Sequence, residues 1–322
     1  RRAHRAHDGA RPLSAPTVLG AAPPPAGGID LDLPGRDVRL AASRWPGVGA
    51  PVVLLHGLAS QRRFWNLVVP HLVAGRNAAG PGAGLPVLAI DQRGHGDSDR
   101  PESGYELTTV AADLSSALDA LGWSRVVLVG HSWGGAVAAT FAAAHPERVL
   151  ALVGVDGGFV SPPAGIDRAA ARRRLEPPRI EMPPDELVAM LSSRSPGSWG
   201  PELAAAVLPI FAVGADGRAR PRLPFDTHMQ IVDTLLDYDA SATLAQVQAP
   251  TWLVSCEPLA DTDDFTAHKT SALQQLASVL PRVRVLRWLG AVHDVPLQWP
   301  ALVAGLVRAA AEDAAVAGRP AS

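Results

Sequence analysis

Short apolar runs alternate with stretches of helical spacing along most of this 322-residue chain, and this alternation limits the fold more than any other feature. Buried strands of a parallel sheet are near-continuous apolar runs, joined by crossover segments that are usually helices. The runs lie at residues 51–55, 86–90, 126–129, 149–155, 251–256 and 283–288. Helical spacing covers residues 62–75, 107–121, 136–144, 266–280 and 297–316. We therefore expect an α/β fold with a mostly parallel sheet flanked by helices.

Two further segments interrupt or precede this pattern. Residues 29–33 and 38–45 alternate at period two around a Pro-Gly turn, which predicts an antiparallel hairpin. Residues 159–245 contain proline pairs and amphipathic pieces without strand-like runs, which predicts a mostly helical inserted cap.

These interruptions give the expected domain organisation. The core is expected to comprise residues 31–158 and 246–322 on either side of the cap. Residues 1–30 contain arginines, histidines and a run of three prolines, so we expect a flexible N-terminal arm there.

The strongest chemical signal is the sequence Gly130-His131-Ser132-Trp133-Gly134, between an apolar strand and a helix of small residues. In a G-x-S-x-G at such a place the serine lies on a tight strand-to-helix turn, where the two glycines avoid side-chain clashes. The turn lifts the hydroxyl out of the sheet, and the helix N-terminus stabilises negative charge that develops beside it. Ser132 is therefore the expected nucleophile.

Four stretches in chain order resemble the α/β-hydrolase family, over nearly all of residues 35–316. They are His56-Gly57-Leu58, the turn from Asp91 to Ser98, the segment from Gly130 to Gly134, and the loop from Gly290 to Leu297. The resemblance implies an α/β-hydrolase fold with a helical cap, and an oxyanion hole made by the backbone N–H groups of Leu58 and Trp133. It also implies that the other polar side chains of these stretches brace loops and take no part in catalysis: His56, Asp91, Arg93, His95 and His131.

One of the ten histidines stands out as the general base. His293 follows the last predicted strand in a glycine-containing loop. This position agrees with the chain order nucleophile, acid, histidine that the fold requires.

Two positions compete for the acid of the triad. In the commoner family pattern the acid follows the strand after the cap, where Leu259 stands in the expected slot and Asp261 lies slightly beyond it. The other position is the end of the strand before the cap, and Asp156 stands there, followed by two glycines. We favour Asp156, with Asp261 as the alternative acid. Either carboxylate would orient the imidazole and stabilise its cation.

These residues predict a serine hydrolase that acts on a small-molecule acyl substrate, with a carboxylic ester as the first choice. The resemblance includes dehalogenases and epoxide hydrolases, but those enzymes carry aspartate where this chain has Ser132. Two alternatives stay open: a cofactor-free haloperoxidase-like or acyl-transfer enzyme with the same triad, and a non-catalytic small-molecule binder.

The composition limits the kinds of molecule that we expect this protein to bind. The net charge of −2 gives no field that would favour nucleic acid or a membrane surface, and a single cysteine excludes an internal disulfide. We find no apolar run long enough to cross a membrane and no signal-peptide pattern in residues 1–30, and we expect a cytoplasmic protein. The sequence contains no phosphate loop, zinc-ligand cluster or dinucleotide fingerprint, so we expect no cofactor and no metal.

Overall fold

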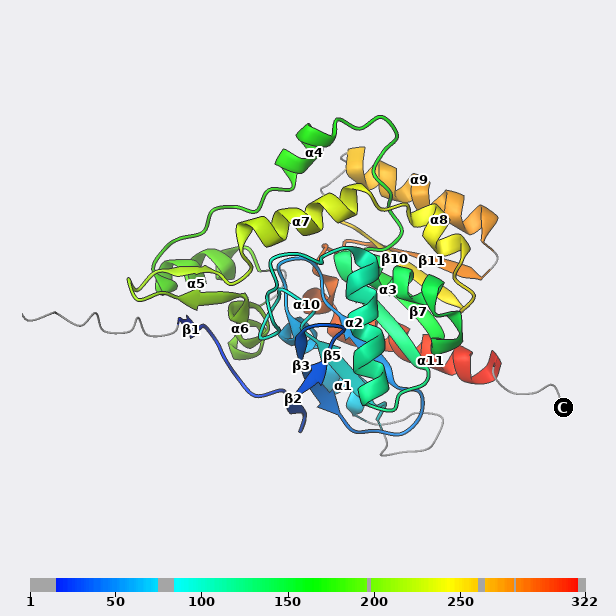
Figure 1. Ribbon diagram of the computed structural model, residues 1–322, viewed down its shortest axis with the longest axis horizontal. Coiled ribbons are helices and arrows are strands. Elements are labelled where there is room, and N and C mark those ends of the chain that lie inside the picture. Colours follow the sequence, from blue (N-terminus) through cyan, green and yellow to red (C-terminus); the bar gives the residue numbers. More distant parts are fainter. Residues whose placement is uncertain (1–15, 75–83, 196–197, 260–263, 281, 318–322) are drawn as a thin grey trace, which may run out of the picture.

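The predicted parallel sheet is present. The computed structural model describes residues 16–74, 84–195, 198–259, 264–280 and 282–317 (Figure 1). Its main sheet has eight strands in the order β11-β10-β7-β6-β4-β5-β3-β2. The strands are β2 (Ile29–Pro34), β3 (Arg39–Trp45), β4 (Val52–Leu55), β5 (Val87–Ile90), β6 (Val126–His131), β7 (Val149–Val155), β10 (Thr251–Glu257) and β11 (Val283–Leu289). From β5 to β11 all neighbours are parallel, and β2 and β3 form the expected antiparallel hairpin.

Helices cover both faces of this sheet. One face packs against α2 (Leu107–Ala120), α3 (Trp133–Ala144) and α9 (Asp264–Val279). The other face packs against α1 (Val69–Val73), α10 (Val295–Gln298) and α11 (Pro300–Ala317). The central strands β4 and β5 are buried throughout, which explains why both read as uninterrupted apolar runs. The predicted fold class is confirmed.

One predicted helix is wrong in its extent. In place of a continuous helix over 62–75, a 3-10 turn η1 (Arg62–Trp65) is followed by the short helix α1. The Gln61 side chain accepts from the Arg63 amide at 2.7 Å, and so begins the turn. Pro70 lies in the first turn of α1, where its missing N–H breaks no hydrogen bond.

The insertion between β7 and β10 is mostly helical, as expected, and contains two short strands that the sequence did not reveal. Its helices are α4 (Arg168–Arg174), α5 (Pro184–Ser193), α6 (Pro201–Val207), α7 (Phe225–Leu236) and α8 (Ala240–Ala245). The strands β8 (Phe211–Val213) and β9 (Ala219–Pro221) pair with each other. Figure 1 shows α5 and α6 on the left, with α4 and α7 above the core.

Part of the expected N-terminal arm has a defined place. Strand β1 (Thr17–Val18) pairs antiparallel with β8, so residues of the arm extend the small sheet of the insertion. Trp45 donates from its indole Nε1 to the carbonyl oxygen of Pro25 at 2.6 Å, which ties the arm to the core as well. Within residues 16–30, the expected arm therefore makes specific contacts with both the insertion and the core. Among the helices that the structure describes, none is long and apolar enough to cross a membrane.

Candidate active site

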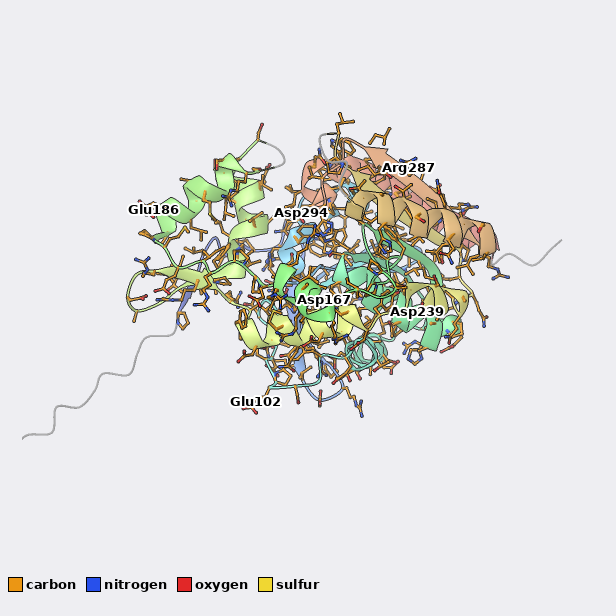
Figure 2. All side chains as sticks on the ribbon, turned by 90° about the horizontal axis from the view of Figure 1, so that it is seen from above. Glu102, Asp167, Glu186, Asp239, Arg287 and Asp294 are labelled. Atoms are coloured by element: carbon orange, nitrogen blue, oxygen red, sulfur yellow. The ribbon has the colours of Figure 1, made fainter. Side chains whose placement is uncertain are left out.

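The expected site residues meet at one edge of the sheet, because each follows the carboxyl end of a parallel strand. Ser132 follows β6, Asp156 follows β7, and His293 lies in the loop after β11. Loops at the carboxyl ends of neighbouring parallel strands converge, which is where open α/β sheets bind their ligands. In Figure 2, Asp294, the neighbour of His293, lies between the side of the molecule that carries Glu186 and the side that carries Arg287.

Ser132 has a strained backbone. Its φ of 52° and ψ of −122° lie outside the regions that residues with a side chain normally occupy. The turn leaves no room beside it, since a Cβ on Gly130 would come within 2.1 Å of the Gly134 carbonyl oxygen. The glycines of the motif are thus required by close backbone packing, as the sequence indicated. The turn presents the serine at the N-terminus of α3.

His293 and Asp156 form a hydrogen-bonded pair. The Nδ1 atom of His293 lies 2.7 Å from Oδ2 of Asp156, whose side chain is 2% exposed. Because Nδ1 donates to the carboxylate, Nε2 is the ring nitrogen that keeps a lone pair for a proton. The imidazole is 55% exposed and lies beside the serine turn, with its ring centre 4.7 Å from that of His131.

The charges of this pair stabilise each other. Loss of water around the ring acts to lower the pKa of His293, but the hydrogen bond and negative charge of Asp156 outweigh it and raise the pKa above its usual value. Burial acts to raise the pKa of Asp156, and the contact with His293 and a positive charge from Lys269 bring it below its usual value. Asp156 is therefore an ionised carboxylate beside a base of increased proton affinity.

The alternative acid, Asp261, lies outside the described residues. Leu259, the residue in the commoner slot for the acid, is 83% exposed. Asp156 itself has a positive φ of 46°, and its amide donates to Val254 of the neighbouring strand at 2.8 Å. Its carboxylate also accepts from the amide of Cys256 at 2.9 Å. The two glycines that follow Asp156 allowed us to expect the turn, but the bond to Cys256 is a contact across 100 residues without a local signal.

The amides expected to form the oxyanion hole belong to Leu58 and Trp133. Among the hydrogen bonds of the described residues, neither amide has a partner. Gly57 fixes the separation of the two loops, because a Cβ at this position would lie 3.0 Å from Cβ of Ser132. The Trp133 indole is 1% exposed and stacks on His95 with ring centres 5.2 Å apart, so it belongs to the core.

Two buried histidines brace the loop that carries Leu58. His56 donates from Nδ1 to the Gly57 carbonyl at 2.8 Å and accepts at Nε2 from the Gln92 amide at 3.1 Å. His95 donates to the carbonyl of Arg93 at 3.0 Å and accepts from the amide of Ala59 at 3.2 Å. Burial lowers the pKa of His56 to about 4 and that of His95 to about 3, so both are neutral and suited to accept an amide hydrogen.

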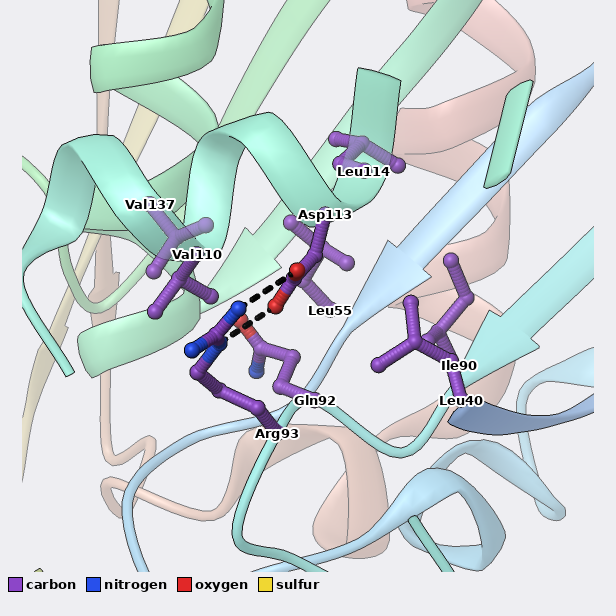
Figure 3. Close-up of a pocket in the computed structure, with 9 residues that line it drawn as sticks. All are labelled: Leu40, Leu55, Ile90, Gln92, Arg93, Val110, Asp113, Leu114 and Val137. Atoms are coloured by element: carbon purple, nitrogen blue, oxygen red, sulfur yellow. Dashed lines mark hydrogen bonds and ion pairs between the residues drawn. The ribbon is translucent and has the colours of Figure 1, made fainter. Parts of the chain in front are cut away.

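Asp91 and Arg93 have structural partners too. The Asp91 carboxylate accepts from the Arg62 amide at 2.5 Å and forms an ion pair with its guanidinium group. Arg93 makes a double contact to Asp113, at 2.5 and 2.7 Å, inside the small cavity of Figure 3. That cavity holds about 10 Å³, close to the minimum for one water molecule, and is otherwise mostly apolar. It cannot admit a substrate.

A larger hollow of about 500 Å³ lies over α9 and the ends of β10 and β11. Its lining includes Glu257, Leu259, Thr270, Arg287 and Leu289. Neither this hollow nor the small cavity is lined by Ser132 or His293.

Sequence reasoning missed one residue of the site. Lys269 on α9 places its ammonium nitrogen 2.9 Å from Oδ1 of Asp156. It lies in an ordinary helical stretch, 113 residues from its partner, and no motif points to it.

An eight-stranded, mostly parallel sheet with a strained serine after β6 and a histidine–carboxylate pair after β11 and β7 defines the α/β-hydrolase fold. The chain has that fold. A family model described as the alpha/beta hydrolase fold matches residues 50–180, a range that contains Ser132 and Asp156 and ends before His293.

Comparison with known proteins agrees with this assignment. Epoxide hydrolase B of Mycobacterium tuberculosis is 36% identical over 132 residues, which is 40% of this chain and 35% of that protein. A soluble epoxide hydrolase of Corynebacterium is 36% identical over 110 residues, 34% of this chain and 35% of the enzyme. The chain thus spans about a third of the length of the curated relatives it matches.

Solved structures match over most of the chain at lower identity. E-2-(acetamidomethylene)succinate hydrolase superposes with a TM-score of 0.71 at 22% identity, over 88% of this chain and 99% of that one. A thermophilic esterase from Thermogutta terrifontis gives a TM-score of 0.63 at 19% identity, over 89% and 99% of the two chains. At such identities the likeness shows the fold alone.

Proposed function

We propose that this protein is a serine hydrolase that cleaves a carboxylic ester through an acyl-enzyme on Ser132. Nε2 of His293 takes the proton of the serine hydroxyl as the oxygen attacks the ester carbonyl. The amides of Leu58 and Trp133 hold the resulting oxyanion, and the imidazolium gives its proton to the departing alkoxide. Water then attacks the acyl group by the same route in reverse.

The observation that carries the proposal is a serine, and not a carboxylate, on the strained turn beside the His293–Asp156 pair. Asp156 holds Nδ1 of the imidazole protonated, so the opposite nitrogen is a base. In this proposal the amides of Leu58 and Trp133, which have no partner among the hydrogen bonds of the described residues, supply the donors that a tetrahedral oxyanion needs. Loss of such a donor costs about 3 kcal/mol of transition-state stabilisation.

The epoxide hydrolases among the relatives suggest a different substrate, and chemistry argues against it here. A carboxylate that opens an epoxide forms an ester, which water hydrolyses at the carbonyl carbon. A serine that opens an epoxide would form an ether, which has no carbonyl for water to attack, so turnover would stop. The one tyrosine of the insertion, Tyr238, is also not available to polarise an epoxide oxygen. Its side chain is buried, with 6% exposed, and its hydroxyl donates to the Gly158 carbonyl at 2.9 Å, so it packs within the protein.

We also propose that residues 159–245 act as a cap that selects the substrate. Side-chain contacts join this insertion to the core, one of them at the turn from Asp91 to Ser98. Arg222 pairs with Asp97 at 2.6 Å, and Gln61 donates to the carbonyl of Ala206 on α6 at 2.9 Å.

The test combines labelling with two substrates. A fluorophosphonate should attach to Ser132, and the protein should hydrolyse short p-nitrophenyl esters but not styrene oxide. Ser132→Ala should remove both labelling and turnover, whereas Ser116→Ala, on the surface helix α2, should keep both. Labelling at another residue, or epoxide hydration that survives Ser132→Ala, would overturn the proposal.

A further inference from the structure

The chain contains 29 lysine and arginine residues in total, and a single one of them, Lys269, is lysine. Its side chain lies on α9 and is 8% exposed. A buried ammonium group is strongly disfavoured unless charged or polar partners replace its water. The partners of this one lysine therefore indicate why it is there.

The ammonium group of Lys269 bridges two neighbours of the candidate site. It lies 2.9 Å from Oδ1 of Asp156 and donates to the carbonyl oxygen of Cys256 at 2.8 Å. The Cys256 amide donates to the same Oδ1 at 2.9 Å, and His293 holds Oδ2. Both oxygens of the carboxylate are thus fixed, one by the imidazole and one by a cation together with an amide.

The residue type matters at this position. A compact ammonium can reach a carboxylate and a carbonyl at once in a small buried space, whereas a planar guanidinium with five N–H donors needs more room and more acceptors. All the other residues in the lysine and arginine total of this chain are arginine.

We propose that Lys269 is a positioning residue for the Asp156–His293 pair, which fixes the carboxylate toward the imidazole and offsets part of its negative charge. The inference rests on the proposed function insofar as it gives this pair a catalytic role. Without the cation, the full charge of Asp156 would act on the imidazolium and hold its proton more tightly. The base would then become available only at higher pH.

Other charges around the pair do not duplicate this effect. His293 also faces Asp294, whose negative charge favours the imidazolium, and His131, which is neutral because burial lowers its pKa to about 4. Glu257 feels the charge of Lys269, but its carboxylate is already paired with Arg287 at 2.6 Å. Among the described residues, Lys269 is the cation in direct contact with the carboxylate of Asp156.

The first experiment is the pH dependence of kcat/KM for an ester in the wild type, Lys269→Met and Lys269→Arg. The methionine variant keeps the volume and loses the charge. The acidic limb of its pH profile, where activity rises as His293 loses its proton, should therefore move to higher pH. Its activity should fall about tenfold more near pH 6 than near pH 8.5. The arginine variant keeps the charge and should keep the wild-type limb, even if its activity is lower at every pH. An equal loss at all pH values in Lys269→Met would show a packing role and overturn the inference.

The second experiment needs neither activity nor a substitution at Lys269. Because the chain has one lysine, protein labelled with ¹³C at lysine Cε gives one lysine side-chain signal. This signal should shift in wild-type protein over the pH range in which His293 titrates, and the shift should disappear in His293→Gln. A signal that stays constant over that range would overturn the inference, even if Lys269→Met does not fold.

The two experiments also separate this inference from the proposed function. If no ester is hydrolysed but the lysine signal shifts as His293 titrates, the ester proposal fails and the electrostatic interaction between Lys269 and the Asp156–His293 pair is confirmed. If Ser132-dependent hydrolysis is found and Lys269→Met keeps the wild-type acidic limb, the ester proposal stands and the role of Lys269 fails.

Discussion

His131 donates from its ring Nε2 to the backbone carbonyl of His293 at 2.9 Å, so the residue before the candidate nucleophile holds the loop of the candidate base. The His131 ring is 3% exposed and stacks on Phe64 with ring centres 4.7 Å apart. The relative position of serine and imidazole thus depends on a side chain that takes no proton.

Replacing His131 by leucine should lower kcat for ester hydrolysis by about fivefold, because loss of one hydrogen bond of about 1 kcal/mol loosens the His293 loop. The acidic limb of the pH profile should not move, since His131 is neutral across the working range. Steady-state kinetics would check this against His71→Leu, an exposed histidine of α1. A shifted limb would mean that His131 titrates during catalysis.

Asp156→Asn should keep the fold and reduce turnover by about 10⁴-fold, because an amide can hold His293 in the wrong tautomer. Asp261→Asn is the matched control and should cost little. Turnover of the two variants, with circular dichroism to check folding, would decide between the two acids. The opposite ranking would move the acid to the loop after β10.

Activity should rise with pH, with a midpoint above pH 6.5. Only the neutral imidazole accepts the serine proton, and the pKa of His293 is raised by Asp156 against the opposing effect of burial. His56, His95 and His131 have pKa values lowered to about 3 or 4 by burial, so they lose their protons well below this range. A profile of kcat/KM from pH 4 to 9 with its midpoint near pH 4 would point to one of these buried rings.

Gly157→Ala should destabilise the protein by about 3 kcal/mol or more, since the new Cβ would come within 2.1 Å of the carbonyl oxygen of Ser132 and backbone atoms cannot easily give way. Gly200→Ala is the control, because a Cβ there meets nothing within 4 Å. Urea unfolding monitored by fluorescence would compare the two midpoints. Equal midpoints would show that the contact between the serine turn and the turn after β7 relaxes without cost.

The sequence predicted those parts of the structure that repeat or that obey local rules. Inner strands of the parallel sheet, such as β4 and β6, are buried along their whole length, so they appear as apolar runs, whereas the edge strand β11 has no fully buried residue and contains two arginines. The turn at Ser132 has a motif dictated by backbone sterics. The sequence favours Asp156 as the acid because the commoner slot holds Leu259, which cannot act as an acid.

The parts that sequence reasoning missed depend on tertiary contacts. Strands β8 and β9 have three residues each, and β8 pairs with both β9 and β1. Such short strands contain no apolar run that would indicate them in the sequence. The contact of Lys269 with Asp156 joins a helix to a strand end far apart in the chain. The break between η1 and α1 follows from Gln61 and Pro70, two local signals that the apolar spacing over 62–75 obscured.

The candidate nucleophile and acid both precede the insertion, only 24 residues apart on two adjacent strands, and the candidate base follows it. Exchange of residues 159–245 for the corresponding segment of another protein would leave the Ser132–Asp156 unit as one uninterrupted stretch of chain. Because we propose that the insertion selects the substrate, we expect recombination at its two ends to change the substrate without changing the residues that carry out the reaction. Chimaeras made at these two junctions would alter which molecules are accepted and preserve the way in which they are cut.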